Sequence, residues 1–383
     1  MIGSFDFLLP TKIRYGAGML SVLGEELRAF NAKKIMVITD KGLVGTGMVQ
    51  KLTDLIEAES ISFILYDEIE GNPKDYNVEA CAKKAREEAV DMLVAFGGGS
   101  PIDAAKAVAV LAKQGGTVRG YEGKGKIKDD CLPILTIPTT AGTGSEVTFS
   151  SVITDTKEKF KFTIKSTAIA AKTAIIDPEL TLSVPPLITA ATGIDALTHA
   201  IEGYTAACTE PIAEAVGLYA VEYISGSIVE AVKNGGNLMA RDRMLMGSLL
   251  AGLSFSHADV ASVHCMAEAL GSIYDAPHGM CNAILLPYVM EYNLPAVEHK
   301  YAKIAQAMGI TESDDCEAAK KGIAHIRTLS KKIGLPGIKA LNVNPDDFER
   351  LAELSVKNGS NASNPRELTK DGYLGLFQRV YEG

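Results

Sequence analysis

Acidic and imidazole side chains gather between residues 195 and 278. Asp195 and His199 are four residues apart inside a helical pattern, so both side chains lie on one helix face. Four of the six histidines fall in this region, namely His199, His257, His264 and His278. A carboxylate with three imidazoles suits Fe²⁺ or Zn²⁺, and the ligand types do not separate these metals. Spacing alone is also compatible with structural histidines and a surface Asp–His hydrogen bond, so both interpretations stay open here.

A glycine-rich turn follows the apolar run Met92–Phe96. It consists of Gly97, Gly98, Gly99 and Ser100, and Pro101 then opens a predicted helix with Asp103 in its first turn. Glycines allow a ligand to approach the backbone closely, and a helix N-terminus favours an anion such as a pyrophosphate. A flexible turn that caps a helix is the alternative, because this run is not the GxGxxG of an ordinary dinucleotide-binding turn.

Two further strand ends support a nucleotide site. The apolar run Pro133–Ile137 leads into the segment PTTAGTGSE, which carries Thr139, Thr140 and Thr143. In open α/β sheets, ligands bind beyond the carboxyl ends of the strands. Another run ends in Thr39-Asp40, where a carboxylate would bond ribose hydroxyls and repel a 2′-phosphate. Asp40 therefore favours NAD over NADP, with a helix cap or turn as the alternative role.

The elements that carry these residues differ between the two halves of the chain. Short apolar strands are predicted at Lys34–Thr39, Ile61–Tyr66, Met92–Phe96 and Pro133–Ile137, with helices at Gly47–Glu59, Asn77–Val90 and Ile102–Lys113. This alternation is typical of a parallel sheet covered on both faces. Beyond Pro185 the pattern is helical, with helices expected near Leu187–Tyr204, Ile212–Lys233, Arg241–Phe255 and Ala261–Ile273. We expect an α/β domain at 1–185 and an all-α domain at 186–383.

Composition narrows the class of protein. The chain has 383 residues, 47% of them hydrophobic and 22% charged, with a formal net charge of -9. The sequence has no dense Lys/Arg run of the kind that binds nucleic acid, and it has no apolar run long enough to predict a membrane span. The N-terminus does not resemble a signal peptide. Six scattered cysteines favour reduced thiols and a cytoplasmic protein.

Five segments together resemble the iron-containing (group III) alcohol dehydrogenase family over essentially the whole length. They are GGGSPIDAAK (Gly97–Lys106), PTTAGTGSE (Pro138–Glu146), DPEL (Asp177–Leu180), ATGIDALTHAIEGY (Ala191–Tyr204) and PHGMCNAILLPYVMEYN (Pro277–Asn293). The resemblance implies an N-terminal dinucleotide-binding α/β domain with a parallel sheet, a C-terminal helical domain, and an active site in the cleft between them.

The same resemblance implies roles for individual residues. The metal ligands would be Asp195, His199, His264 and His278, and the metal Fe²⁺, with Zn²⁺ as the alternative. The pyrophosphate would lie on Gly97, Gly98, Gly99 and Ser100, and the rest of the cofactor site would be lined by Asp103, Thr139, Thr140, Thr143 and Lys161. Asp40 matches the residue associated with NAD preference in the family.

The chain departs from the family pattern at Glu268. Many members have a histidine there, four residues after the third ligand. Glu268 could act as a general base, approach the metal, pair with a polar or cationic substrate group, or be a hydrogen-bonded carboxylate with no chemical role. His257 is a second departure, which could line the substrate pocket or face solvent.

These features predict an NAD-dependent, metal-dependent dehydrogenase that interconverts a small primary alcohol or diol and its aldehyde. The alternatives are polyol oxidation like that of glycerol dehydrogenase, reduction of a charged aldehyde, and a non-catalytic nucleotide-binding scaffold. Family habit implies a homodimer or a larger homo-oligomer. No nucleic-acid or membrane partner is expected.

Overall fold

The computed structural model describes residues 3–128 and 130–383, which divide into two compact units. One unit is α/β and comprises Leu8–Thr140 and Ser145–Val184. The other is helical and comprises Pro185–Gly383, the short segment Ala141–Gly144 and an N-terminal segment that ends at Phe7. We keep the simpler division at 1–185 and 186–383 as a proposal for the folding domains.

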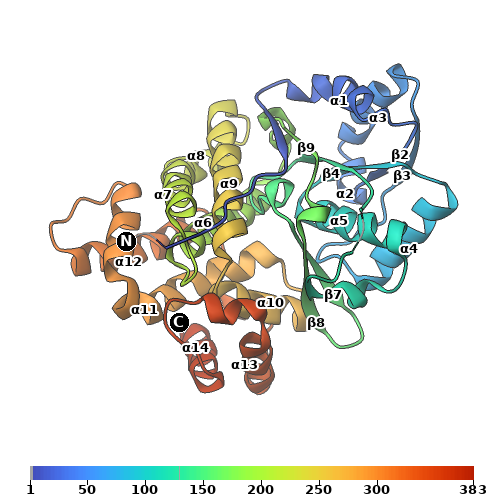
Figure 1. Ribbon diagram of the computed structural model, residues 1–383. Helices are drawn as coiled ribbons and strands as arrows, with labels where there is room; N and C mark the ends of the chain where they lie inside the picture. Colours follow the sequence, from blue (N-terminus) through green and yellow to red (C-terminus); the bar gives the residue numbers. More distant parts are fainter. Residues whose placement is uncertain (1–2, 129) are drawn as a thin grey trace. The chain divides into compact units, whose positions relative to one another are not determined.

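A parallel six-stranded sheet forms the centre of the α/β unit (Figure 1). Its order is β1 (Lys12–Tyr15), β9 (Thr173–Ile176), β6 (Ile134–Pro138), β4 (Met92–Gly97), β2 (Lys34–Ile38) and β3 (Ser62–Tyr66). The four strands predicted from apolar runs are confirmed as β2, β3, β4 and β6. The short β1 and β9 were not predicted from the sequence.

Both faces of this sheet are buried. Successive side chains of a strand point to opposite faces, so alternate residues belong to different cores. Met36 and Ile38 of β2 belong to a core shared with α4 (Asp75–Glu87) and α5 (Gly99–Gln114). Ile35 and Val37 belong to another core, shared with α1 (Leu23–Ala29) and α3 (Met48–Ala58). The strands therefore read as continuous apolar runs rather than as alternating ones.

A smaller sheet adds β5 (Gly123–Lys124), β8 (Phe160–Lys165) and β7 (Ser150–Asp155). β7 and β8 pair antiparallel, while β5 runs parallel to β8. Ile153, Phe162 and Ile164 are buried in the same core as α5. This hairpin was also not predicted.

Helices make up the second unit, as the fold class predicts. They are α6 (Pro186–Thr205), α7 (Pro211–Ser225), α8 (Ile228–Lys233), α9 (Leu238–Ala258), α10 (Ser262–Tyr274), α11 (His278–Ala307), α12 (Asp315–Lys332), α13 (Phe348–Lys357) and α14 (Lys370–Glu382). α6 packs against α7, α9 and α11, which explains why it is buried along nearly its whole length. Within the described residues, no helix is long and apolar enough to cross a membrane.

Candidate metal centre and cofactor-binding edge

Three candidate metal ligands meet inside the helical unit. Asp195 and His199 come from α6 and His264 from α10, and one ligand atom of each lies within 4.8 Å of the others. All three side chains are buried. The rings of His199 and His264 stack with centroids 4.5 Å apart. The structure therefore brings together residues that are far apart in sequence, as a shared ion would require.

His278 approaches the same group from the first residue of α11. Its Nε2 lies 3.7 Å from Asp195 Oδ1, and its ring centroid is 5.2 Å from that of His264. The approach depends on Gly279, because a Cβ atom there would lie 2.4 Å from the carbonyl oxygen of Ala191 in α6. A glycine after His278 therefore allows the start of α11 to pack directly on the backbone of α6.

Electron-pair donors converge on one point in this cluster. The amide nitrogen of Asn282 lies 2.6 Å from Asp195 Oδ1, 3.1 Å from His264 Nε2 and 3.3 Å from His278 Nε2. Three acceptor atoms around one donor are more than an amide can satisfy with its two protons. Among the described residues, Asn282 Oδ1 is buried with no hydrogen-bond partner. The arrangement fits a divalent cation of the Fe²⁺ or Zn²⁺ type.

The cluster also shifts the pKa values of its members. Burial would raise the pKa of Asp195, but the three histidines and Asn282 outweigh burial and leave that pKa below its usual value. Burial lowers the pKa of His199 to about 4, so its imidazole is neutral at pH 7. An ionised carboxylate and a neutral imidazole are the protonation states that bind metal.

Two residues of this cluster were not predicted from the sequence. Glu202 lies one turn beyond His199 on α6 and its Oε2 is 2.5 Å from His264 Nδ1. Asn282 lies one turn beyond His278 on α11. In each case the signal was a polar residue three or four positions after a candidate ligand, which places it on the same helix face.

Glu268 lies one turn after His264 on α10 and is half-buried. Its Oε2 accepts a hydrogen bond of 2.6 Å from Asn358 Nδ2. The carboxylate is close enough to His264 to raise the pKa of that imidazole, although burial and Glu202 affect that pKa more strongly. The hydrogen-bonded state anticipated for Glu268 is therefore present, beside the candidate ligands.

His257 is placed differently, near the end of α9. Its ring stacks on Phe7 with centroids 3.9 Å apart, and its Nδ1 lies 2.9 Å from the carbonyl oxygen of Leu253. Phe255, two residues earlier, stacks instead on His199 at 4.3 Å. Residues two apart point to nearly opposite sides of a helix. Phe255, rather than His257, therefore faces the cluster.

The candidate cofactor residues of the α/β unit lie at the carboxyl edge of three adjacent strands. Asp40 follows β2, Gly97 ends β4, and Thr139 follows β6. The chain runs from β2 outward to β3 and then returns to β4 on the other side of β2. Such a reversal of strand order is the place where open α/β sheets bind ligands.

The backbone at this edge forms a cradle that requires glycine at position 97. Gly97 has φ +152, and a Cβ there would lie 2.8 Å from Pro101 Cγ and 3.5 Å from Asp40 Oδ2. A Cβ at Gly98 would lie 3.3 Å from Thr140 Oγ1. α5 begins at Gly99, so Gly99 and Ser100 supply its first N–H groups. The cradle fits a pyrophosphate at a helix N-terminus.

The other cofactor candidates have contacts within the protein. Asp40 Oδ1 accepts a hydrogen bond from the backbone N–H of Leu43 at 2.9 Å. This is the helix cap that was the alternative role predicted for Asp40. Both oxygens of Asp103 are bonded, to Ser145 Oγ at 2.6 Å and to the backbone N–H of Val152 at 3.0 Å. Asp103 therefore ties α5 to β7.

Lys161 and Thr143 complete the predicted set. Lys161 lies on β8, is buried, and donates from Nζ to Asn72 Oδ1 at 2.7 Å. Thr143 belongs to the segment Ala141–Gly144, which groups with the helical unit rather than with Thr139 and Thr140. Its neighbour Gly144 explains this grouping, since a Cβ there would lie 2.5 Å from Gly252 Cα of α9.

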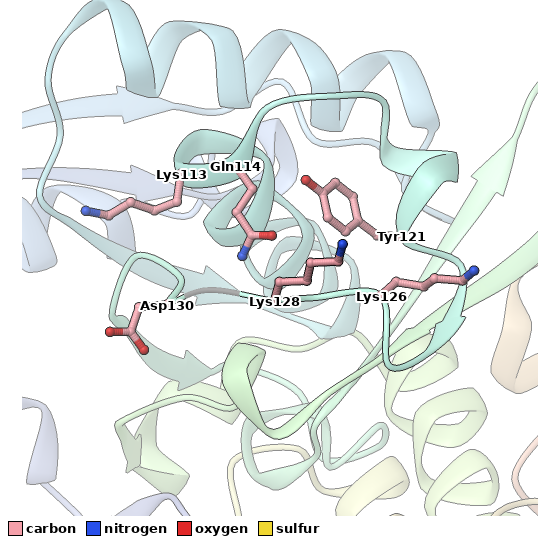
Figure 2. A pocket seen from close by; sticks show the side chains of 6 residues that line it. All are labelled: Lys113, Gln114, Tyr121, Lys126, Lys128 and Asp130. Atoms are coloured by element: carbon pink, nitrogen blue, oxygen red, sulfur yellow. The ribbon is translucent and has the colours of Figure 1, made fainter.

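A pocket of about 730 Å³ lies elsewhere on the α/β unit. Figure 2 shows the residues that line it, which are Lys113, Gln114, Tyr121, Lys126, Lys128 and Asp130. Its lysines are solvent-exposed and one carboxylate lies among them. None of these residues is a candidate for catalysis or binding, and exposed lysines alone do not define a site.

Comparison with known proteins places the chain in a family. The family model for iron-containing alcohol dehydrogenases matches residues 10–178, and the model for the C-terminal part of that family matches residues 189–381. A 1,3-propanediol dehydrogenase of Klebsiella pneumoniae is 40% identical over 382 residues, covering 98% of this chain and 99% of the relative. A choline dehydrogenase of Bacillus subtilis is 39% identical, covering 98% of this chain and 94% of the relative.

A crystal structure of a 1,3-propanediol oxidoreductase has the same fold. It superposes with a TM-score of 0.95 at 39% identity, covering 99% of this chain and 100% of that one. The resemblance seen in the sequence motifs is thereby confirmed. The chain belongs to the iron-containing alcohol dehydrogenase family of oxidoreductases.

Proposed function

We propose that this protein is an NAD-dependent, metal-dependent dehydrogenase that interconverts a small primary alcohol or diol and its aldehyde. The observation that carries the proposal is the convergence of the buried Asp195, His199 and His264 in one cluster, which the partly buried His278 approaches. The family and the names of the relatives support the reaction class. The proposed metal is Fe²⁺, with Zn²⁺ as the alternative that the same ligands allow.

The cofactor and the metal supply the reactive chemistry, and the chain positions them. When bound, a divalent ion held by these ligands would supply Lewis-acid polarisation of an alcohol or carbonyl oxygen, and NAD⁺ or NADH would supply a hydride acceptor or donor. Asp195 would supply the negative charge of the metal site, since its pKa lies below the usual value. His199 and His264 are buried and held in place by stacking, which limits the movement of these two ligands.

We infer a preference for NAD over NADP from Asp40. A carboxylate beside the glycine cradle favours ribose hydroxyls and repels a 2′-phosphate. Replacing Asp40 by Ser would remove that repulsion and still allow a helix cap. We expect D40S to raise kcat/KM for NADPH relative to NADH, because NADPH loses a repulsive charge while NADH loses a partner for its ribose hydroxyls.

Glu268 supports a second candidate substrate class. A half-buried carboxylate one helical turn from a proposed metal ligand would favour a neutral or cationic substrate over an anionic one. A relative named for choline, which is a cationic alcohol, makes this class worth testing. Reduction of a cationic aldehyde is therefore the alternative to a neutral diol or alcohol.

The proposal is tested by oxidation of NADH with neutral, cationic and anionic aldehydes, using protein loaded with Fe²⁺ or Zn²⁺. We expect metal-dependent turnover in the wild type and almost none in H278A. H299A is the control, because His299 lies beyond the kink at Val297 of α11, with 70% of its side chain exposed. Near-normal turnover in H278A would show that the ligand assignment is wrong. A folded protein that binds no metal and reduces no aldehyde would favour the scaffold alternative.

We further propose a cytoplasmic protein that forms a homodimer or larger homo-oligomer. All six cysteines are thiols rather than disulfides, which suits a reducing compartment. Light scattering of the purified protein would measure the oligomeric state.

A further inference from the structure

One face of α6 carries a further acidic residue, Glu202, beyond the two candidate ligands. Asp195, His199 and Glu202 follow one another at intervals of four and three residues, so their side chains form a stripe along the helix. Glu202 is 4% exposed. A buried carboxylate requires partners, because an unpaired charge in the interior is strongly unfavourable.

The carboxylate of Glu202 finds these partners at the beginning of α10. Its Oε2 accepts from the backbone N–H of Ala261 at 2.9 Å, and its Oε1 accepts from the backbone N–H of Val263 at 2.8 Å. No side chain of α10 itself caps this end of the helix. Glu202 therefore takes the place of a cap and holds the first turn of α10 against α6.

The same carboxylate reaches the His264 ring. Oε2 lies 2.5 Å from Nδ1 of His264, which is 62 residues later in the chain. Because a carboxylate oxygen only accepts hydrogen bonds, Nδ1 of His264 is the donor in this contact. The other ring nitrogen, Nε2, then presents its lone pair to the cluster, where it lies 3.9 Å from Asp195 Oδ1.

We propose that Glu202 is the positioning residue of the metal centre, which fixes both the orientation and the tautomer of His264. The inference rests on the proposed metal site. Carboxylates that accept the second N–H of a ligand histidine set ring orientation and ligand strength in metal sites, and their loss typically costs 10- to 100-fold in metal affinity. In this protein α6 would thus supply two ligands and orient a third.

Glu202→Gln tests the proposal with little change in shape. An amide with its carbonyl oxygen toward Ala261 and His264 keeps those hydrogen bonds, but its NH₂ group then faces the N–H of Val263. In the opposite orientation the NH₂ group faces His264, which must then carry its proton on Nε2 and loses its lone pair toward the metal. In both orientations His264 loses the negatively charged acceptor that strengthens it as a ligand. We expect E202Q to bind Zn²⁺ about 10- to 100-fold more weakly than wild type in competition with a chromophoric chelator.

Glu210→Gln is the matched control. Glu210 is also buried and also caps a helix from its carboxylate, accepting from the backbone N–H groups of Ile212 and Ala213 at 2.8 and 2.7 Å. E210Q should lose unfolding free energy without losing Zn²⁺ affinity. Equal Zn²⁺ affinities of E202Q, E210Q and wild type would overturn the proposal while leaving the metal site intact. A wild type that binds no Zn²⁺ would instead overturn the site itself and this inference with it.

A second measurement covers the case in which E202Q does not fold. In ¹⁵N-histidine-labelled wild type loaded with Zn²⁺, we expect the His264 ring to carry its proton on Nδ1 and to bind metal through Nε2. A His264 ring protonated on Nε2 would overturn the proposal, whatever the stability of the variant.

Discussion

The single methyl group added by Gly279→Ala should move the proposed ligand His278 away from the other proposed ligands. A Cβ at this position would lie 2.4 Å from the carbonyl oxygen of Ala191 and 3.2 Å from Asp195 Cβ. A carbon–oxygen contact normally needs about 3.3 Å, so the start of α11 must move by about 1 Å. Metal–ligand distances tolerate only about 0.2 Å, which means that His278 would leave its bonding position.

The expected magnitudes follow from this overlap. Overpacking costs about 1–3 kcal/mol, while an alanine in a helix gains about 1 kcal/mol over glycine. We therefore expect a net loss of up to about 2 kcal/mol in unfolding free energy and a fall of about 10-fold or more in Zn²⁺ affinity. Urea unfolding and chelator competition measure the two quantities.

Gly375→Ala in α14 is the control for helix propensity, since nothing lies within 4 Å of a Cβ there. G375A should keep Zn²⁺ affinity and be as stable as wild type or more so. If G279A bound Zn²⁺ as tightly as G375A does, the close packing of α11 on α6 would not be what places His278.

Three other perturbations have defined outcomes. Lys106→Met should cost about 1–3 kcal/mol in urea unfolding, because the buried Lys106 Nζ donates to Ser145 and Thr148 and these acceptors would be left unsatisfied. Exposed Lys113 on the same helix should tolerate methionine within about 0.5 kcal/mol. Glu146→Gln should become more stable relative to wild type as pH rises from 4.5 to 7. Burial raises the pKa of Glu146 to about 7, so the unfolding free energy of wild type falls by about 3 kcal/mol over this pH range. Parallel pH profiles of unfolding free energy for wild type and E146Q would refute this reasoning. Zn²⁺ at 100 times the wild-type Kd should add about 2.7 kcal/mol to the unfolding free energy of wild type after chelation, and about 1.4 kcal/mol or less to that of H278A.

Local patterns predicted much of the architecture. The runs at β2, β4 and β6 are apolar on both faces, so strands of a covered parallel sheet could be inferred without knowing their neighbours. The short strands β1 and β9 and the β7–β8 hairpin were missed. β1 and β9 have only four residues each, and their pairing joins segments as distant as Lys12 and Thr173. Such pairing depends on register across the sheet rather than on local propensity.

The candidate site was likewise predicted only in part. The sequence motifs were sufficient to identify the family, and through that resemblance they named Asp195, His199, His264 and His278 as candidate ligands. Helix packing alone decided what surrounds them. Glu202 contacts His264 only because the start of α10 lies against α6, and Asn282 lies 87 residues from its partner Asp195. Hydrogen bonds between distant residues require helices to be packed within a few ångströms, and that packing is set by the whole core rather than by any one segment.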